Sequence, residues 1–351
     1  MTTTRNSSKG GIIDIDSAVK GALQAIERER EREIVSRRFG LYDRKETLEQ
    51  IGELLGITRE RVRQLEKVVL SKLKAAAKTR ELNAINEAES KLLSILTKNN
   101  DCMRVGDLAA VIAKDGSRGE QAKLFFLAML APKISVIDEN EHYYQSIGTK
   151  SVHDSDKMRS IIDSLLKAVK KIGHPESMEE IAKVAGLKDS AHAAALAKTS
   201  KHLAELNGQW GLTKWPMVNP KNIRDKIYVI LSQKGSHMHF NEIAEAIRES
   251  DFKRKDVTTQ AIHNELIKDK RFVLIGRGIY ALDEWGYKKG TVADIISEVL
   301  KDANEPLHRD EIVKRVLKSR HVKETTILLN LQGKHQFKRV AKATYTLAEV
   351  A

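Results

Sequence analysis

Apolar residues between positions 47 and 73 recur at the spacing of two consecutive helices. Gly56 separates the two series, because glycine adopts the left-handed conformation that ends a helix at little cost. Thr47 and Gln50 have the spacing of a reciprocal cap for the first helix, and Thr58 can cap the second. The apolar positions are Ile51, Leu54 and Leu55, then Val62, Leu65, Val69 and Leu73. The pattern predicts a helix-turn-helix.

The second of these helices carries a polar arc opposite its apolar positions. At about 100° per residue, the arc contains Arg59, Glu60, Arg63, Gln64 and Lys67. Arginine can hydrogen-bond both acceptors of guanine, glutamine can pair with adenine, and glutamate can accept from cytosine. The arc therefore predicts a helix that lies in the major groove of DNA. The alternative interpretation is an ordinary solvated helix face.

An apolar edge precedes the helix-turn-helix and contains Val19, Leu23, Ile26 and Ile34. We expect this edge to dock on the helix-turn-helix. The alternating charges of Glu27–Glu33 indicate a solvated helix face.

The chain beyond Lys78 shows an internal repeat of about 65 to 70 residues. Each of the four units has a helix, a second helix with a hydrophobic-acidic signature, a third helix and two short β-like runs. The second helices contain GDLAAVI, MEEIAKVAG, NEIAEAI and RDEIVKRV. One aromatic residue recurs in the closing β-run, at spacings of 66, 70 and 65 residues: Tyr144, Trp210, Tyr280 and Tyr345.

A helical head followed by a β-ribbon is the winged helix-turn-helix pattern. The clearest ribbon is Arg271–Leu282, where Gly276 and Gly278 supply a hairpin turn between apolar strands. The predicted fold class is mainly α: one helix-turn-helix followed by four tandem winged-helix units with short β-hairpin wings. The predicted boundaries are a flexible N-terminus at 1–15, the helix-turn-helix at 16–80, and units at 84–148, 155–216, 221–287 and 290–350.

Charge is concentrated on the second helix of the helix-turn-helix. The 351-residue chain has a net charge of +13, which favours a polyanionic partner. Residues 58–80 hold 8 basic and 2 acidic side chains, whereas residues 81–150 hold 8 and 10. We therefore expect double-stranded DNA as the partner of the helix-turn-helix.

Other chemistry receives little support from the sequence. Cys102 is the only cysteine and is interpreted as a small buried hydrophobe, which excludes disulfides and cysteine-based zinc sites. His237 and His239 are interpreted as cap or turn residues rather than metal ligands. No apolar run is long enough to span a membrane, and no signal peptide is visible. We expect a cytoplasmic, nucleoid-associated protein that is no enzyme and needs no cofactor or metal.

The segment TLEQIGELLGITRERVRQLEKVVLSKL, with RFGL upstream, resembles the fourth conserved region of housekeeping-type bacterial sigma factors. In that family this helix reads the promoter −35 element and packs near the polymerase flap. The resemblance implies that Arg59, Glu60, Arg63 and Gln64 face bases and that Arg61 and Lys67 contact the DNA backbone. It also implies RNA polymerase core as a second partner.

The chain departs from the sigma family in lacking an aromatic-rich segment of the kind that melts the −10 element, so we expect it not to be a complete sigma factor. The third unit resembles the HARE-type helix-turn-helix domain, a family that includes the delta subunit of bacterial RNA polymerase. The carrying segments are FNEIAEAI, VTTQAIHNEL and FVLIGRGIYALDEWGY.

Three hypotheses follow. The leading one is a sequence-specific transcription regulator that reads a promoter-like element and associates with RNA polymerase. The second is a polymerase-docked adaptor whose units bind proteins, which the acidic first unit favours. The third is a DNA-reading component of a modification or restriction system, by analogy with HARE-bearing fusions.

Overall fold

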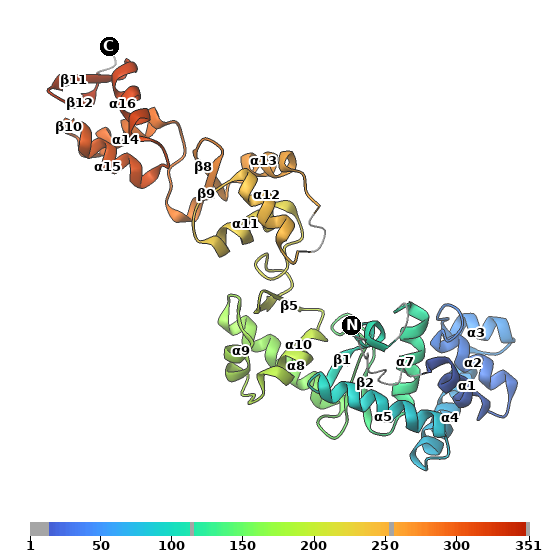
Figure 1. Cartoon of the computed structure of the whole chain (residues 1–351). Coiled ribbons are helices and arrows are strands. Elements are labelled where there is room, and N and C mark those ends of the chain that lie inside the picture. Colours follow the sequence, from blue (N-terminus) through green and yellow to red (C-terminus); the bar gives the residue numbers. More distant parts are fainter. Residues whose placement is uncertain (1–13, 113–115, 253–255, 349–351) are drawn as a thin grey trace, which may run out of the picture. The chain divides into compact units, whose positions relative to one another are not determined.

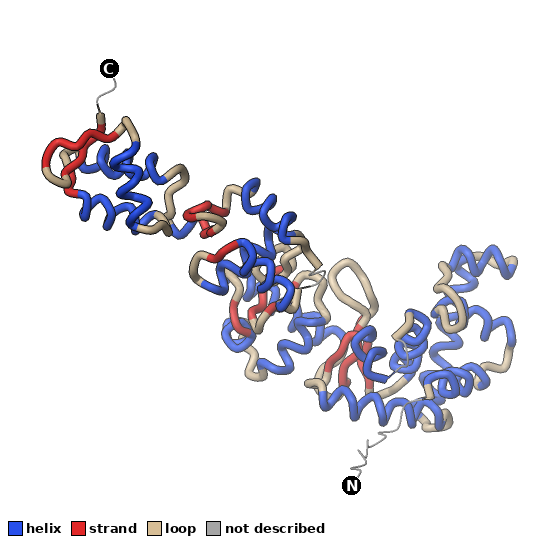
Figure 2. The backbone as a smooth tube through the Cα atoms, turned by 45° about the horizontal axis from the view of Figure 1, so that its top comes forward, coloured by secondary structure: helices blue, strands red, loops and turns tan. Residues whose placement is uncertain are grey.

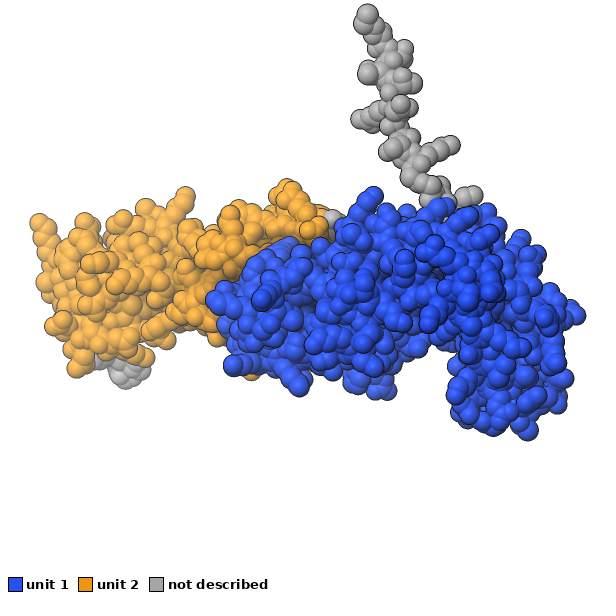
Figure 3. Space-filling view, turned by 90° about the horizontal axis from the view of Figure 1, so that it is seen from below, with its two compact units in different colours: residues 1–213 blue, residues 214–351 orange. Residues whose placement is uncertain are grey.

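A computed structural model describes residues 14–112, 116–252 and 256–348 of the chain. The chain divides into two compact units, residues 1–213 and 214–351 (Figure 3). The described residues are mainly helical, and their strands gather in small separate groups (Figure 2). The predicted N-terminal segment 1–15 falls almost entirely on residues 1–13, which lie outside the described residues. None of the described helices has the length and apolar character of a membrane-spanning segment.

The helix-turn-helix forms where the sequence predicts it. Thr47 and Gln50 make both hydrogen bonds of the predicted capping box, and Gly56 ends the first helix at a φ of 64°. The Thr58 hydroxyl accepts a hydrogen bond from the Arg61 amide and begins the second helix. The first four helices of the chain are α1 (Ile15–Gln24), α2 (Glu29–Phe39), α3 (Leu48–Leu55) and α4 (Arg59–Lys78), coloured blue to cyan in Figure 1.

The helix α4 belongs to two hydrophobic cores. In its first half Val62 packs with Ile34 of α2 and Ile51 of α3, and this small core holds the helix-turn-helix together. In its second half Val69 and Leu73 lie in a larger core shared with the helices that follow. The helix-turn-helix is therefore joined to the rest of its unit through α4, which contributes residues to both cores.

The docking predicted for the N-terminal apolar edge is wrong in part. Ile34 packs in the helix-turn-helix core as expected. Val19 and Leu23, however, lie on α1, which packs directly against the later helices α5 (Asn83–Lys98) and α7 (Arg118–Leu130). Hydrophobic spacing identifies the buried face of a helix but not which partner covers it.

Four repeats follow, each with the order helix, strand, helix, helix, strand, strand (Figure 1). The first repeat (residues 83–149) adds β1 (Cys102–Arg104), α6 (Val105–Ile112), β2 (Ile134–Ile137) and β3 (Ser146–Thr149) to α5 and α7. The second repeat (155–212) contains α8 (Ser155–Ile172), β4 (Glu176–Ser177), α9 (Met178–Val184), α10 (Ser190–Lys198), β5 (Leu203–Leu206) and β6 (Gln209–Leu212).

The second compact unit holds the other two repeats. The third repeat (223–285) contains α11 (Ile223–Lys234), β7 (Met238–His239), α12 (Phe240–Glu249), α13 (Thr259–Lys268), β8 (Phe272–Gly276), β9 (Ile279–Leu282) and the 3₁₀ turn η1 (Asp283–Trp285). The fourth repeat (292–347) contains α14 (Val292–Ala303), β10 (Leu307–His308), α15 (Arg309–Ser319), α16 (Glu324–Gly333), β11 (Phe337–Ala341) and β12 (Thr344–Leu347).

Each repeat has a three-stranded antiparallel sheet with its last strand in the middle. The sequence predicted only the two hairpin strands. The additional strands β1, β4, β7 and β10 have two or three residues each. Such short strands show no period-two alternation, and only pairing with a distant strand defines them.

The register of the sheets corrects the predicted aromatic repeat. Trp210, Tyr280 and Tyr345 occupy the same position, opposite both outer strands of their sheets. In the first repeat Ile147 takes this position, opposite Met103 and Val136. Tyr144 precedes β3, is 37% exposed and lies beneath the guanidinium of Arg104. The near-constant spacing of the aromatic residues therefore led to a wrong prediction for the first repeat, where Ile147 and not Tyr144 is equivalent to Trp210.

Candidate nucleic-acid interface

The polar side of α4 is exposed along its length. All six predicted site residues are exposed: Arg59, Glu60, Arg61, Arg63, Gln64 and Lys67. Five of them fall within an arc of about 140° around the helix, away from the buried Val62, Val69 and Leu73, and Arg61 lies about 60° outside this arc. The fold thus buries one side of α4 and leaves a polar surface on the other.

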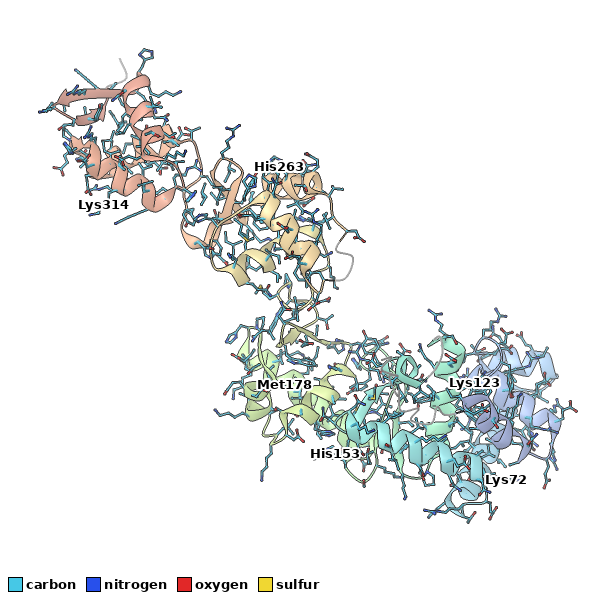
Figure 4. All side chains as sticks on the ribbon, in the orientation of Figure 1. Lys72, Lys123, His153, Met178, His263 and Lys314 are labelled. Carbon is cyan, nitrogen blue, oxygen red and sulfur yellow. The ribbon has the colours of Figure 1, made fainter. Side chains whose placement is uncertain are left out.

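Two lysines extend this surface beyond the predicted set. Lys74 and Lys78 are exposed on the last turns of α4, within about 60° of Arg63 on the helical wheel. Together with Arg59 and Lys67 they form a basic stripe over nearly the full 20 residues of the helix. The same wheel could have identified them, because the stripe continues at helical spacing past Lys67. Lys72, which is labelled in Figure 4, lies at least about 120° from these four cations on the helical wheel.

Hydrogen bonds connect the polar side chains at the start of α4. The guanidinium of Arg63 donates to both carboxylate oxygens of Glu60, at 2.8 and 2.7 Å. The amide of Gln64 donates to the same carboxylate at 3.4 Å, and Arg61 donates to the Gln64 side-chain oxygen at 3.4 Å. The hydrogen bond from Arg63 is the main reason that the pKa of Glu60 lies below its ordinary value. Glu60 is therefore an anion that orients Arg63 along the surface.

The sequence analysis did not predict that Glu49 pairs with Arg59. Arg59 Nη1 lies 2.6 Å from Glu49 Oε1, so the first residue of α4 is paired with an acid of α3. Both side chains are more than half exposed, and such pairs contribute little to stability. A duplex could therefore displace Glu49 from Arg59 at small cost. The pair spans the turn between helices, so neither helical spacing nor local charge pattern indicates it.

The histidines and the cysteine have structural environments. His239 and His308 begin α12 and α15, each accepting a hydrogen bond on Nδ1 from a backbone amide of the first turn. The expected cap role of His239 is thus confirmed. Cys102 is buried as expected, and burial raises the pKa of its thiol to about 12. Within the described residues, no three His, Cys, Asp or Glu side chains are arranged to hold a metal ion.

Comparison with known proteins assigns the helix-turn-helix to a family region. Residues 28–75 match the family model "Sigma-70, region 4" and form a domain of that type. A relative from Arabidopsis thaliana, "RNA polymerase sigma factor sigB", is 42% identical over 62 residues, which are 17% of this chain and 11% of the relative. "RNA polymerase sigma factor SigA" proteins from Bacillus sp and Listeria monocytogenes are 46% and 44% identical over 55 residues. The latter matches cover 15% of each chain, so the resemblance spans a small part of these relatives.

Proposed function

We propose that this protein is a sequence-specific transcription regulator that reads a promoter-like DNA element with α4 and associates with RNA polymerase. The observation that carries the proposal is the exposed polar stripe of α4 within a sigma-70 region 4 domain. Regions of this type bind promoter DNA and RNA polymerase. The proposed role is not enzymatic.

The chemistry of α4 suits a major groove, which is wide enough to admit a helix. In our proposal Arg59, Arg63 and Gln64 read base edges, since side chains at the start of a recognition helix reach deepest. Glu60 either accepts a hydrogen bond from a cytosine amino group, or gives up its hydrogen bonds with Arg63 when Arg63 binds a guanine instead. Arg61 and Lys67, followed by Lys74 and Lys78, contact phosphates and set the register of the helix.

We propose that the four repeats are winged-helix units and that the third is of the HARE type. The repeated order of three helices and three strands supports this, as does a sheet in which the last two strands form a hairpin. Arg277 and Gly278 form the tip of the third hairpin, and Gly278 has a φ of 70° there. Tandem modules raise the effective concentration of each for a shared target.

Selection of binding sites from random duplexes by the full-length protein tests the reading role of α4. The selected duplex and a scrambled duplex are then compared for Arg59→Ala and Gln64→Ala. In each variant the ratio of affinities for the selected and the scrambled duplex should fall about tenfold, because a base contact is worth about 1–3 kcal/mol. The matched control is Lys72→Ala, which removes a cation about two turns beyond Gln64 and outside the basic stripe, and this variant should keep the preference. Unchanged preference in both reading variants would contradict the proposal.

The association with RNA polymerase is tested separately by retention of purified core polymerase on the tagged protein after nuclease treatment. Retention supports the proposal. The alternative, a polymerase-docked adaptor, is favoured by the apolar side chains that the helix-turn-helix exposes, Leu54 at 55% and Val68 at 51%. An adaptor would retain polymerase but show no sequence preference on DNA, so the two experiments distinguish the hypotheses.

A further inference from the structure

Within the first unit, the loop between β2 and β3 of the first repeat is covered by the second repeat. The Tyr144 amide donates to the Thr199 carbonyl at 2.8 Å, and the Lys201 amide donates to the His142 carbonyl at 2.8 Å. Tyr143 forms an isolated β-bridge with Ser200, and its hydroxyl donates to Asp163 of α8 at 2.8 Å. These bonds join the hairpin loop of one repeat to the body of the next.

The hairpin of the third repeat is contacted by the fourth repeat in a similar way. The Arg320 guanidinium donates to the Leu274 carbonyl of β8, and the His321 amide donates to the Ile275 carbonyl at 3.0 Å. Arg320 is only 7% exposed. A Cβ added at Gly276 would lie 2.5 Å from the His321 carbonyl oxygen, so the two backbones approach closely. The outer edge of this hairpin is occupied by the fourth repeat.

The hairpin of the fourth repeat has a different environment. Only Phe337 of β11 is buried, and the other four residues of the strand are exposed. Lys338 and Arg339 lie on this strand, Lys342 lies in the turn, and Lys334 precedes the strand. The ion pairs that the described residues of this repeat form are on other elements, including Arg309–Asp310 and Arg315–Glu311. Within the described residues the hairpin cations form no ion pair, and Arg339 Nε donates to the Ala341 carbonyl of the same hairpin at 3.1 Å.

The net charge of the segment from the third helix to the last strand rises from the first repeat to the fourth. From the third helix to the last strand, the first repeat carries 3 basic and 4 acidic side chains, and the second carries 2 and 1. The third carries 4 and 2, and its Arg271 is held by Asp269 at 2.7 Å and Asp225 at 3.2 Å. The fourth carries 4 and 1, and no acid occurs between Thr325 and Ala348. The uncovered hairpin is thus also the segment with the largest positive excess.

We propose that the α16–β11–β12 segment of the fourth repeat, residues 324–347, is a second DNA-binding surface that contacts the phosphates of a duplex. Lysine and arginine bind phosphate without regard to sequence, and exposed Gln332 can add a neutral donor. Glu324 is the one acid of this segment, and residues 325–347 carry no carboxylate side chain that would repel a polyanion. The inference rests on the proposed function for duplex DNA as the ligand, but it does not need α4 to read bases.

The paired variant Lys338→Ala/Arg339→Ala in the full-length protein tests this surface. Binding to a long duplex is measured between 50 and 200 mM salt. Loss of two phosphate contacts lowers the slope of log affinity against log salt by about 2, so wild-type affinity should fall about tenfold more than variant affinity over this range. The preference for a selected over a scrambled duplex should stay unchanged.

The matched control is Lys314→Ala/Lys318→Ala, which removes the same charge from the exposed side of α15 in the same repeat (Figure 4). Its salt slope should equal that of the wild type. An unchanged slope in the hairpin variant would overturn the inference, as would loss of polymerase retention with DNA binding intact. If Arg59→Ala leaves base preference unchanged while the hairpin variant lowers the slope, the reading role of α4 fails and this surface stands.

Discussion

At the residue scale, two glycines of the helix-turn-helix serve different physical needs. Gly56 has a φ of 64° and no atom near the position of a Cβ, so it is required by backbone conformation alone. Gly52 lies within α3 in ordinary helical conformation, but a Cβ there would lie 2.7 Å from the Ile57 carbonyl oxygen. Gly52 is thus required by the close approach of the chain after the turn.

Gly52→Ala should therefore destabilise the protein although alanine favours helices. Alanine gains about 1 kcal/mol in helix propensity over glycine. The backbone shift that makes room for the added Cβ costs about 1–3 kcal/mol. Gly106→Ala in α6 is the matched control, because its nearest neighbour is the Gln121 side chain at 3.8 Å. Urea unfolding should show opposite signs for the two variants. A stabilised Gly52→Ala would show that the turn can open without cost.

At the element scale, α4 depends on both of its ends. Its first half is held by the small core around Ile51, and its second half is anchored in the core of the first repeat. The residues proposed to read bases occupy the first two turns, next to the Thr58 cap. The cap therefore controls the order of the backbone that carries the candidate site.

Thr58→Ala should lower stability by about 1 kcal/mol, because it leaves an amide of the first turn without its side-chain acceptor. DNA affinity should fall with it, since the frayed turn no longer holds Arg59 in place. Thr58→Ser keeps the hydroxyl and should restore both properties. Thermal unfolding and duplex titration measure the two effects. Equal affinity in Thr58→Ala and the wild type would show that the first turn is ordered by other contacts.

At the scale of the whole molecule, histidine pairs occur where consecutive repeats meet within each unit. His153 and His192 have ring centroids 5.1 Å apart between the first and second repeats. His237 and His321 lie 4.3 Å apart between the third and fourth. Burial first, and the neighbouring histidine next, lower the pKa of His153 and of His237. Lys157 adds to this effect at His153, whereas Asp154 and Glu242 oppose it.

Stability should therefore fall as the pH drops below about 6.5, the ordinary value for histidine. In that range the unfolded chain binds more protons than the folded chain, so protonation favours unfolding. The thermal unfolding midpoint should be lower at pH 5.5 than at pH 7.5, and His153→Gln should reduce the difference. His335→Gln, an exposed histidine outside both pairs, should leave it intact. A midpoint independent of pH in the wild type would refute this prediction.

Features that depend on neighbours within a few residues could be predicted from the amino-acid sequence. The capping box of Thr47 and Gln50, the left-handed Gly56, the exposed arc of α4 and the repeated helices could all be predicted, because they follow from local hydrogen bonds and helical spacing. The base-reading role of this arc and the winged-helix nature of the repeats stay predictions.

Contacts between distant segments became visible only in the folded protein. The tertiary structure paired Arg59 with Glu49, moved α1 from the helix-turn-helix to the first repeat, and gave Ile147 rather than Tyr144 the central position in the first sheet. It also covered the hairpins of the first and third repeats and left Lys338 and Arg339 exposed. Such contacts join residues far apart in the chain, where many apolar faces and charges are equally suited as partners, so the packing of the whole fold selects among them.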